Sequence, residues 1–308
     1  MWQVAGMSTN PAMPSIGLVP RHDLARLLER TSRTFALAIP LLEEPLATQV
    51  GLAYLLFRVA DELEDAPRWG RERRARALAS FVEWIDGPSD SPEWMSLVEN
   101  DPPTVHPGCL ELLARGGDVL GATRSLPQPI ATTILAHTRR TARGMAEFVA
   151  TQDEHGGLVL SDVDDLRRYA YVVAGIVGEM LTDLFSHADA GVAAARVALD
   201  ADARSFGEGL QLVNILKDAP SDAREGRVYL PPNVARSTIV ELARSDLARA
   251  TRYVRTLVDA RAPRGVVAFC ELPVCLAEAT LDRLEAGAPK LSRDEVMAIV
   301  ADVTSRDG

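Results

Sequence analysis

Charged residues recur one helical turn apart within an apolar stretch of the sequence, AYLLFRVADELEDAP (Ala53–Pro67). Residues three or four apart share a face of an α-helix, so Arg58, Asp61 and Asp65 would project together, with Tyr54 one turn earlier. In a buried cleft, two such aspartates destabilise the fold unless a cation compensates their charge. Mg²⁺ fits because it binds one or two carboxylates together with phosphate oxygens. A solvated, acidic helix end is the competing interpretation.

A second polar stripe lies in GEGLQLVNILKDAPSDAREGRVYLPP (Gly207–Pro232). Gln211, Asn214 and Asp218 follow one another at helical spacing, and Asp222 lies one further turn along. Leucine, valine and isoleucine surround them, which is difficult to explain by exposure to solvent. Buried amides and carboxylates need partners. The segment therefore indicates either a polar network within the core or a binding site.

Pro220 interrupts the second stripe and is expected to bend the helix, so that Asp222 follows on a kinked turn. Arg224 and Arg227 come next, and arginine is well suited to binding phosphate. The two stripes together provide two aspartate pairs, each with arginine nearby. Facing across a cavity, they could hold Mg²⁺ ions against a diphosphate. The formal net charge of −10 repels anions, so metals and arginines would have to reverse the potential at such a site.

The composition favours close helix packing, because hydrophobic residues make up 47% of the chain and aromatic residues only 5%. Ser161 and Asp164 resemble a capping box at the start of one helix. No convincing alternating strand is present. We predict a single-domain, all-α helical bundle over residues 21–308, preceded by a flexible leader over residues 1–20. The main helices are expected at Arg21–Phe35, Thr48–Asp65, Arg71–Ile85, Ser161–Phe185, Val192–Lys217, Ser237–Ala260 and Val266–Ala286.

The charge and cysteine content exclude several classes of protein. A net charge of −10 offers no basic excess for binding nucleic acid. Cys109, Cys270 and Cys275 match neither a disulfide framework nor a zinc ribbon, which indicates a reducing compartment. The longest apolar stretches are far shorter than a membrane span, and the first twenty residues do not resemble a secretory signal. A cytoplasmic location is therefore expected.

Four segments, taken in order, resemble motifs of the squalene/phytoene synthase family, the head-to-head isoprenyl diphosphate synthases. The resemblance extends from about Thr31 to Lys290, and the order and spacing make it specific. The segments are SRTF (Ser32–Phe35), RVADELED (Arg58–Asp65), YAYVVAGIVGE (Tyr169–Glu179) and QLVNILKDAPSDAREGRVYLP (Gln211–Pro231). The resemblance implies an isoprenoid-synthase-type helical bundle around a central cavity.

The resemblance also implies roles for individual residues. Arg58, Asp61, Asp218 and Tyr169 would be catalytic, with the ring of Tyr169 facing a carbocation. A late segment, GAPKLSR (Gly287–Arg293), resembles the part of squalene synthases that contacts NADPH; Lys290 matches its lysine, whereas Ser292 replaces a usual arginine. The implied metal ligands are Asp61, Asp65, Asp218 and Asp222. The implied substrate-binding residues are Ser32, Arg33, Phe35, Arg58, Gln211, Asn214, Arg227 and Tyr253.

The implied activity is Mg²⁺-dependent condensation of two farnesyl diphosphates through presqualene diphosphate to squalene, with NADPH as reductant. Without a reductant the product would be of the phytoene or dehydrosqualene type. A presqualene diphosphate-forming enzyme, a terpene-cyclising relative and a non-catalytic scaffold are also compatible with the resemblance. The expected partners are prenyl diphosphates, with transient contact at a membrane surface for product release. The oligomeric state and the prenyl chain length stay open.

Overall fold

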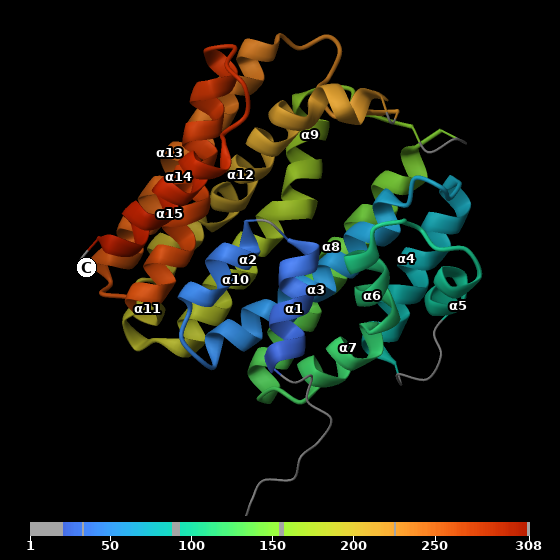
Figure 1. The fold of residues 1–308 in the computed structure, drawn as a ribbon, viewed down its shortest axis with the longest axis horizontal. Coiled ribbons are helices and arrows are strands. Elements are labelled where there is room, and N and C mark those ends of the chain that lie inside the picture. The colour runs from blue at the N-terminus through green and yellow to red at the C-terminus, as the bar shows by residue number, and fades with distance from the viewer. Residues whose placement is uncertain (1–20, 33, 88–92, 154–156, 225, 307–308) are drawn as a thin grey trace, which may run out of the picture.

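The computed structural model describes residues 21–32, 34–87, 93–153, 157–224 and 226–306 (Figure 1). The leader expected over residues 1–20 and the predicted substrate contact Arg33 lie outside these ranges. The α-helices are α1 Arg21–Thr31, α2 Phe35–Ala38, α3 Leu46–Asp65, α4 Arg71–Asp86, α5 Glu93–Asn100, α6 Pro107–Ala114, α7 Gly116–Arg124, α8 Gln128–Thr151, α9 Val163–Ala170, α10 Ile176–Ala188, α11 Ala190–Ala194, α12 Arg196–Arg224, α13 Arg236–Asp259, α14 Arg264–Glu285 and α15 Arg293–Ser305.

The long helices form a ring around a central space. Helix α3 packs on α8, α8 on α10, and α10 on α12. Helix α12 packs in turn on α13 and α14, while α14 reaches α2, and α1 links α2 back to α3 (Figure 1). The architecture is the all-α bundle that the sequence predicts. Among the described residues, no helix combines the length and apolar character that a membrane span requires.

One short ladder departs from the helical pattern. Strands β1 (Leu158–Val159) and β2 (Arg227–Val228) pair in parallel, with Leu158 opposite Arg227. The alternation of apolar and polar residues that marks longer strands cannot develop over two residues. This pairing anchors the chain directly after α12 and thereby places Arg227 beside the central space.

Helix α12 continues through Pro220 to Arg224, so Asp222 lies on the helix rather than after it. Pro220 has no N–H to donate to the carbonyl of Leu216, four residues earlier. The guanidinium of Arg236 donates to that carbonyl instead, at 3.1 Å. A side chain from α13 thus replaces the missing backbone hydrogen bond and lets the helix extend past the proline.

The helix predicted from Ser161 to Phe185 is composite, and its cap is one residue later than expected. Asp162, not Ser161, is the N-cap, because its carboxylate accepts the backbone N–H of Asp165 at 2.8 Å. A π-helical turn, Tyr171–Gly175, separates α9 from α10. The hydroxyl of Thr141 on α8 donates to the carbonyl of Val172 in this turn. Turns of this kind are frequent at functional sites.

Candidate active site

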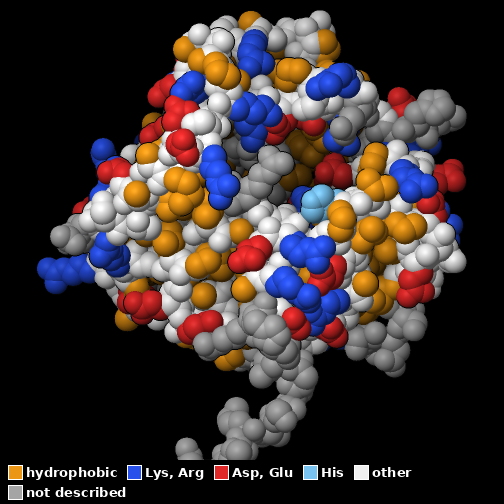
Figure 2. All heavy atoms as spheres, in the orientation of Figure 1, with side chains coloured by type: hydrophobic (Ala, Val, Ile, Leu, Met, Phe, Trp, Pro, Cys, Tyr) orange, Lys and Arg blue, Asp and Glu red, His pale blue; other side chains and the backbone are white. Residues whose placement is uncertain are grey.

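A cavity of about 590 Å³ opens between α3 and α12. Figure 2 shows the hollow on the molecular face, with acidic and apolar side chains inside it and basic side chains around it. Helix α3 contributes Tyr54, Arg58, Asp61, Glu64 and Asp65 to the wall, and α12 contributes Gln211, Asn214, Lys217, Asp218 and Asp222. Both stripes that the sequence singled out therefore line one cavity.

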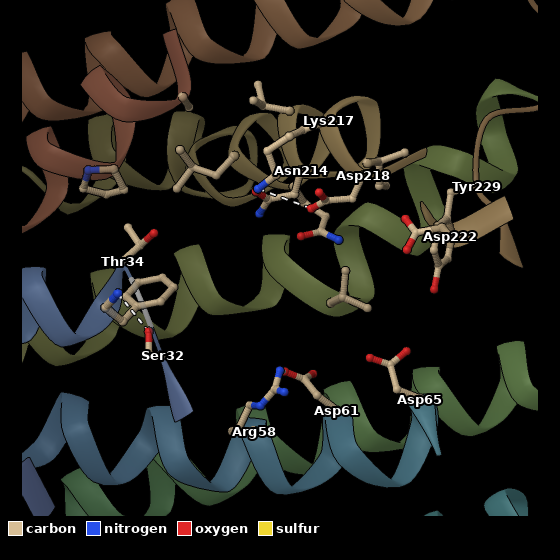
Figure 3. Close-up of a pocket in the computed structure, with 18 of the residues that line it drawn as sticks. Ser32, Thr34, Arg58, Asp61, Asp65, Asn214, Lys217, Asp218, Asp222 and Tyr229 are labelled. Atoms are coloured by element: carbon tan, nitrogen blue, oxygen red, sulfur yellow. Dashed lines mark hydrogen bonds and ion pairs between the residues drawn. The ribbon is translucent and has the colours of Figure 1, made fainter. Parts of the chain in front are cut away.

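The two aspartate pairs face one another across the cavity mouth. Asp61 and Asp65 project from α3 toward Asp218 and Asp222 on α12 (Figure 3). Arg227 lies between the two motifs: its Nη1 is 3.9 Å from Asp65 Oδ1 and its Nη2 is 3.7 Å from Asp222 Oδ1. One guanidinium thus links carboxylates from both walls, as a phosphate-binding group at a shared site would.

The guanidinium of Arg58 lies on the floor of the polar mouth. Its Nη1 is 3.8 Å from Asp61 Oδ2, and its Nη2 donates to Glu62. Within the described part of the chain, its Nε is buried and has no hydrogen-bond partner. The side chain as a whole is 30% exposed and lines the cavity, so the outer nitrogens of the guanidinium can reach an anionic group there.

The surroundings of two carboxylates at the mouth disfavour their charged forms. Burial in the cavity wall raises the pKa of Asp61 to about 7; Arg58 opposes this shift, whereas Asp65 and Glu62 add to it. Burial also raises the pKa of Glu64 well above its usual range, and the neighbouring charges of Asp65 and Asp61 raise it further. A bound cation would oppose both shifts, because it favours the charged form of each carboxylate.

The donor set fits a hard divalent cation. Among the described residues, no three His, Cys, Asp or Glu side chains gather closely enough to form a cage for an ion. The aspartates come instead as pairs on opposite walls. One or two carboxylates, completed by water and phosphate oxygens, is the arrangement that Mg²⁺ uses. Asp61, Asp65, Asp218 and Asp222 are the residues that would hold it.

An apolar hollow of about 200 Å³ continues inward from the polar mouth. The two spaces share wall residues, among them Tyr54, Leu210 and Asn214. The inner part is closed by apolar side chains of α3, α10, α12 and α14, namely Val50, Phe57, Val177, Met180, Leu181, Phe206 and Phe269. The site is therefore amphipathic, with charge at the entrance and a hydrocarbon-like interior.

Ser32, Thr34 and Phe35, which belong to the first motif, lie along one side of the entrance. Ser32 and Phe35 line the cavity, and the Ser32 hydroxyl accepts the N–H of Phe35 at 3.0 Å. The Phe35 ring lies against Tyr54, with the ring centroids 5.4 Å apart, and the Tyr54 hydroxyl donates to the carbonyl of Thr31. These contacts fix Ser32 and the start of α2 beside the polar mouth.

Tyr169 lines the cavity and lies beside Tyr229, which directly follows β2. Burial raises the pKa of both phenols well above the usual range, and nearby carboxylates raise it further. Both side chains therefore remain neutral. They present aromatic rings, rather than phenolate charge, to whatever occupies the cavity.

The sequence comparison agrees with this geometry. Residues 28–238 match the sequence model of the family described as squalene/phytoene synthase. The chain belongs to the squalene/phytoene synthase family. It is 28% identical to squalene synthase from Homo sapiens over 309 residues, covering 91% of this chain and 69% of the relative. A probable squalene synthase from Neurospora crassa is 29% identical over 235 residues, and the match spans 76% of this chain but only 46% of that relative.

Solved structures show the same fold. A ligand complex of TcSQS superposes with a TM-score of 0.73 at 23% identity, covering 91% of this chain and 84% of that structure. A dehydrosqualene synthase in complex with a ligand gives a TM-score of 0.60 at 18% identity, covering 92% of this chain and 94% of that structure. The all-helical isoprenoid-synthase fold of the family is thus present here.

Tyr253 is the predicted site residue that the fold places away from the cavity. Its side chain is fully buried between helices, and it is not among the residues that line the described cavities. Its hydroxyl is 2.8 Å from Thr182 Oγ1, and its ring lies 5.0 Å from that of Phe206. The predicted substrate contact is therefore replaced by a core contact, since Thr182 satisfies the hydroxyl.

The late segment with Lys290 reaches the second aspartate motif. Lys290 Nζ is 3.0 Å from Asp218 Oδ1. Ser292, which the sequence comparison with the NADPH-contacting segment singled out, is the N-cap of α15 and forms a capping box with Glu295. The structure thus brings Lys290 to a predicted metal ligand. Ser292 instead has a structural role, the start of a helix.

The sequence analysis missed three residues at this site. Glu64 lay within the acidic motif but was not singled out, although it follows Asp61 by three residues and so shares a face of the helix with it. Lys217 precedes Asp218, and its ammonium is 2.9 Å from Asn214 Oδ1. Tyr229 is an aromatic residue in the segment VYLPP, but no spacing in the sequence could place it beside Tyr169.

Proposed function

We propose that this protein condenses two farnesyl diphosphates head to head through presqualene diphosphate to squalene, with Mg²⁺ as the required metal. One observation carries the proposal: two aspartate pairs face each other at the mouth of an apolar hollow, with Arg227 between them. Relatives named squalene synthase support the choice of substrate and product.

The charged entrance accounts for binding and ionisation of the first substrate. Mg²⁺ held by the four aspartates would supply Lewis-acid assistance, because it carries the charge of the departing diphosphate. Arg58 and Arg227 present planar donor groups that match phosphate oxygens. Asn214 and Gln211 line the same wall and can donate amide hydrogens. These side chains orient the leaving group so that the allylic carbon faces inward.

The interior accounts for the later, cationic steps. Its apolar walls exclude water, which would otherwise quench a carbocation. Tyr169 and Tyr229 line the polar mouth with neutral rings, and cation–π attraction to such a ring is worth about 0.5–2 kcal/mol. In the first half-reaction, the allylic cation adds to the double bond of the second farnesyl diphosphate, and proton loss closes a cyclopropane.

The product depends on how the second cation is discharged. We assign NADPH as the hydride donor, with Lys290 as a contact for it, on the resemblance of the segment around Lys290. Hydride capture by the rearranged cation gives squalene, whereas proton loss would give a dehydrosqualene or phytoene type of product. A squalene synthase among the relatives covers 91% of this chain at 28% identity, and this supports the reductive outcome.

A direct test incubates the purified protein with farnesyl diphosphate and Mg²⁺, with and without NADPH, and analyses hexane extracts for hydrocarbons and the aqueous phase for diphosphates. Squalene should form only with NADPH, and presqualene diphosphate should accumulate without it. Absence of both products would refute the proposal. Preferential turnover of geranylgeranyl diphosphate would move the assignment to phytoene formation. Asp61→Asn and Asp218→Asn variants, each still folded by circular dichroism, should lose the activity and serve as negative controls.

A further inference from the structure

The two oxygens of the Asp218 carboxylate are held by two different lysines. Lys290 Nζ is 3.0 Å from Oδ1, and Lys217 Nζ is 3.3 Å from Oδ2. Lys217 belongs to the same helix as Asp218 and is also hydrogen-bonded to Asn214, whereas Lys290 reaches across from the connection between α14 and α15 (Figure 3 labels Lys217, Asn214 and Asp218). Both oxygens that a metal ion would use are therefore in contact with an ammonium group.

The amino-acid composition makes this arrangement unusual. Lys217 and Lys290 are the two lysines of the whole chain, and the other 31 of its 33 Lys and Arg residues are arginines. The protein thus uses arginine for its other basic positions and lysine at the two that meet one carboxylate. Arginine binds a carboxylate with a rigid, two-pronged group, whereas lysine offers a compact point charge on a flexible stem. Lysine is the residue type suited to a contact that must be exchanged.

The backbone on both sides of Lys290 is fixed. Gly287 ends α14 with a left-handed φ of 63°, and the N–H of Ala288 donates to the carbonyl of Arg283 at 2.8 Å. Ser292 begins α15 through its capping box with Glu295, and Arg283 pairs with Glu295 across the two helices. Lys290 therefore stays near the cavity mouth, while its side chain, 69% exposed, can move.

We propose that Lys290 is a positioning residue for the second aspartate motif, which holds Asp218 Oδ1 and is displaced from it by the divalent cation. The inference rests on the proposed function, because it requires Mg²⁺ at Asp218. An exposed ammonium–carboxylate pair is weak, so the ion can displace it readily. The displaced ammonium then lies at the same entrance, available to an anionic group of a bound ligand.

The inference predicts opposite effects of two substitutions on Mg²⁺ affinity, measured by calorimetry on the full chain without substrate or NADPH. Lys290→Gln removes the competitor and should tighten Mg²⁺ binding about two- to fivefold. Lys290→Arg supplies a two-pronged competitor and should weaken binding. Arg293→Gln is the matched control, because it removes a positive charge from the start of α15, three residues along the chain. If Lys290→Gln and Arg293→Gln shift the affinity equally, the inference is overturned.

Displacement can also be observed directly, because the chain contains two lysines. Protein labelled with ε-¹³C-lysine should give two side-chain NMR signals, assigned with Lys217→Arg and Lys290→Arg variants. Mg²⁺ should move the Lys290 signal to the position that it has in the Asp218→Asn variant. A Lys290 signal that stays in place while Mg²⁺ binds overturns this inference alone. If calorimetry detects no Mg²⁺ binding, the proposed metal site fails, and this inference fails with it.

Discussion

The ring of Tyr169 stacks on the ring of Tyr229, with their centroids 4.8 Å apart and their planes 28° apart. The Tyr169 hydroxyl donates to the Tyr229 hydroxyl at 3.2 Å. Phe148 closes the other side of Tyr169 edge-on, at 5.2 Å. The orientation of Tyr169 in the cavity therefore depends on two aromatic neighbours, one of which follows the short ladder at β2.

Tyr229→Ala should expose the carbocation intermediate to water more than Tyr229→Phe does. The phenylalanine variant loses one hydrogen bond, worth about 0.5–1.5 kcal/mol, so the turnover rate should fall by no more than about tenfold. The alanine variant also removes the stacked ring and admits water, so alcohols formed by water capture should increase among the products. Chromatography with mass detection of the extracts measures both effects. An unchanged product pattern in Tyr229→Ala would show that Tyr169 does not need this support.

Tyr253→Phe provides the complementary test, because Tyr253 lies in the core and not at the cavity. Its hydroxyl loses the contact with Thr182, whose own hydroxyl still donates to the carbonyl of Gly178. Loss of one hydrogen bond, about 0.5–1.5 kcal/mol, should lower the melting temperature by about 1–5 °C and leave the turnover number within about twofold. Thermal unfolding and steady-state kinetics on the same preparation decide the matter. A large loss of turnover at an unchanged melting temperature would instead support a role of Tyr253 in substrate binding.

The sequence predicts the polar stripes well because they depend on local geometry. Asp61 and Asp65, and likewise Asp218 and Asp222, lie one turn apart on helices whose other residues are apolar. Contacts between distant segments are different. Lys290 and Asp218 are 72 residues apart, so no local periodicity can show that their side chains meet. Tyr229 reaches Tyr169 only through a two-residue ladder, which is too short to leave a periodic signal.

Further differences arise where two residues satisfy the same local rule. Ser161 and Asp162 are both good N-cap residues, and the backbone selects the second. Pro220 alone predicts a bend in the helix, whereas the hydrogen bond that Arg236 donates to the carbonyl of Leu216 comes from another helix and has no local sequence signal. A buried tyrosine such as Tyr253 suits a core and a cavity wall equally well, so composition could not assign it.

Asp61→Asn should raise the stability of the protein at alkaline pH and weaken its response to Mg²⁺. The pKa of Asp61 is raised to about 7, so the folded protein binds this proton more tightly than the unfolded chain does. The free energy of unfolding therefore falls as pH rises from about 4 through about 7, and the asparagine variant lacks this penalty. With chelator present, it should melt about 2 °C above the unsubstituted protein at pH 8, after allowance for solvent screening, and at the same temperature at pH 4.

The control for this effect is Glu147→Gln, on the exposed face of α8 and away from the cavity. It should show no such pH-dependent difference. Added Mg²⁺ at pH 8 should raise the melting temperature of the unsubstituted protein and of Glu147→Gln, but that of Asp61→Asn much less. Scanning fluorimetry over a pH series, with and without Mg²⁺, measures all of these shifts. Equal melting temperatures of Asp61→Asn and the unsubstituted protein at pH 8 would contradict the raised pKa.

Gly207→Ala should destabilise the contact between α12 and the π-helical turn in the wall of the apolar hollow. A Cβ at position 207 would lie 2.0 Å from the carbonyl oxygen of Ala174, which is backbone and cannot rotate away. Overpacking of this kind typically costs about 1–3 kcal/mol, so the melting temperature should fall by about 2–12 °C. Because Gly207 and Ala174 both line the hollow, the separation of the two segments should also reduce turnover in protein that remains folded.

Gly121→Ala on α7 is the matched control, since its Cβ would meet nothing within 4 Å. There the substitution should leave turnover unchanged and raise the melting temperature slightly, because alanine restricts the unfolded chain and favours the helix. If both alanine variants melt at the same temperature, the π-helical turn and α12 are not held together by this close approach.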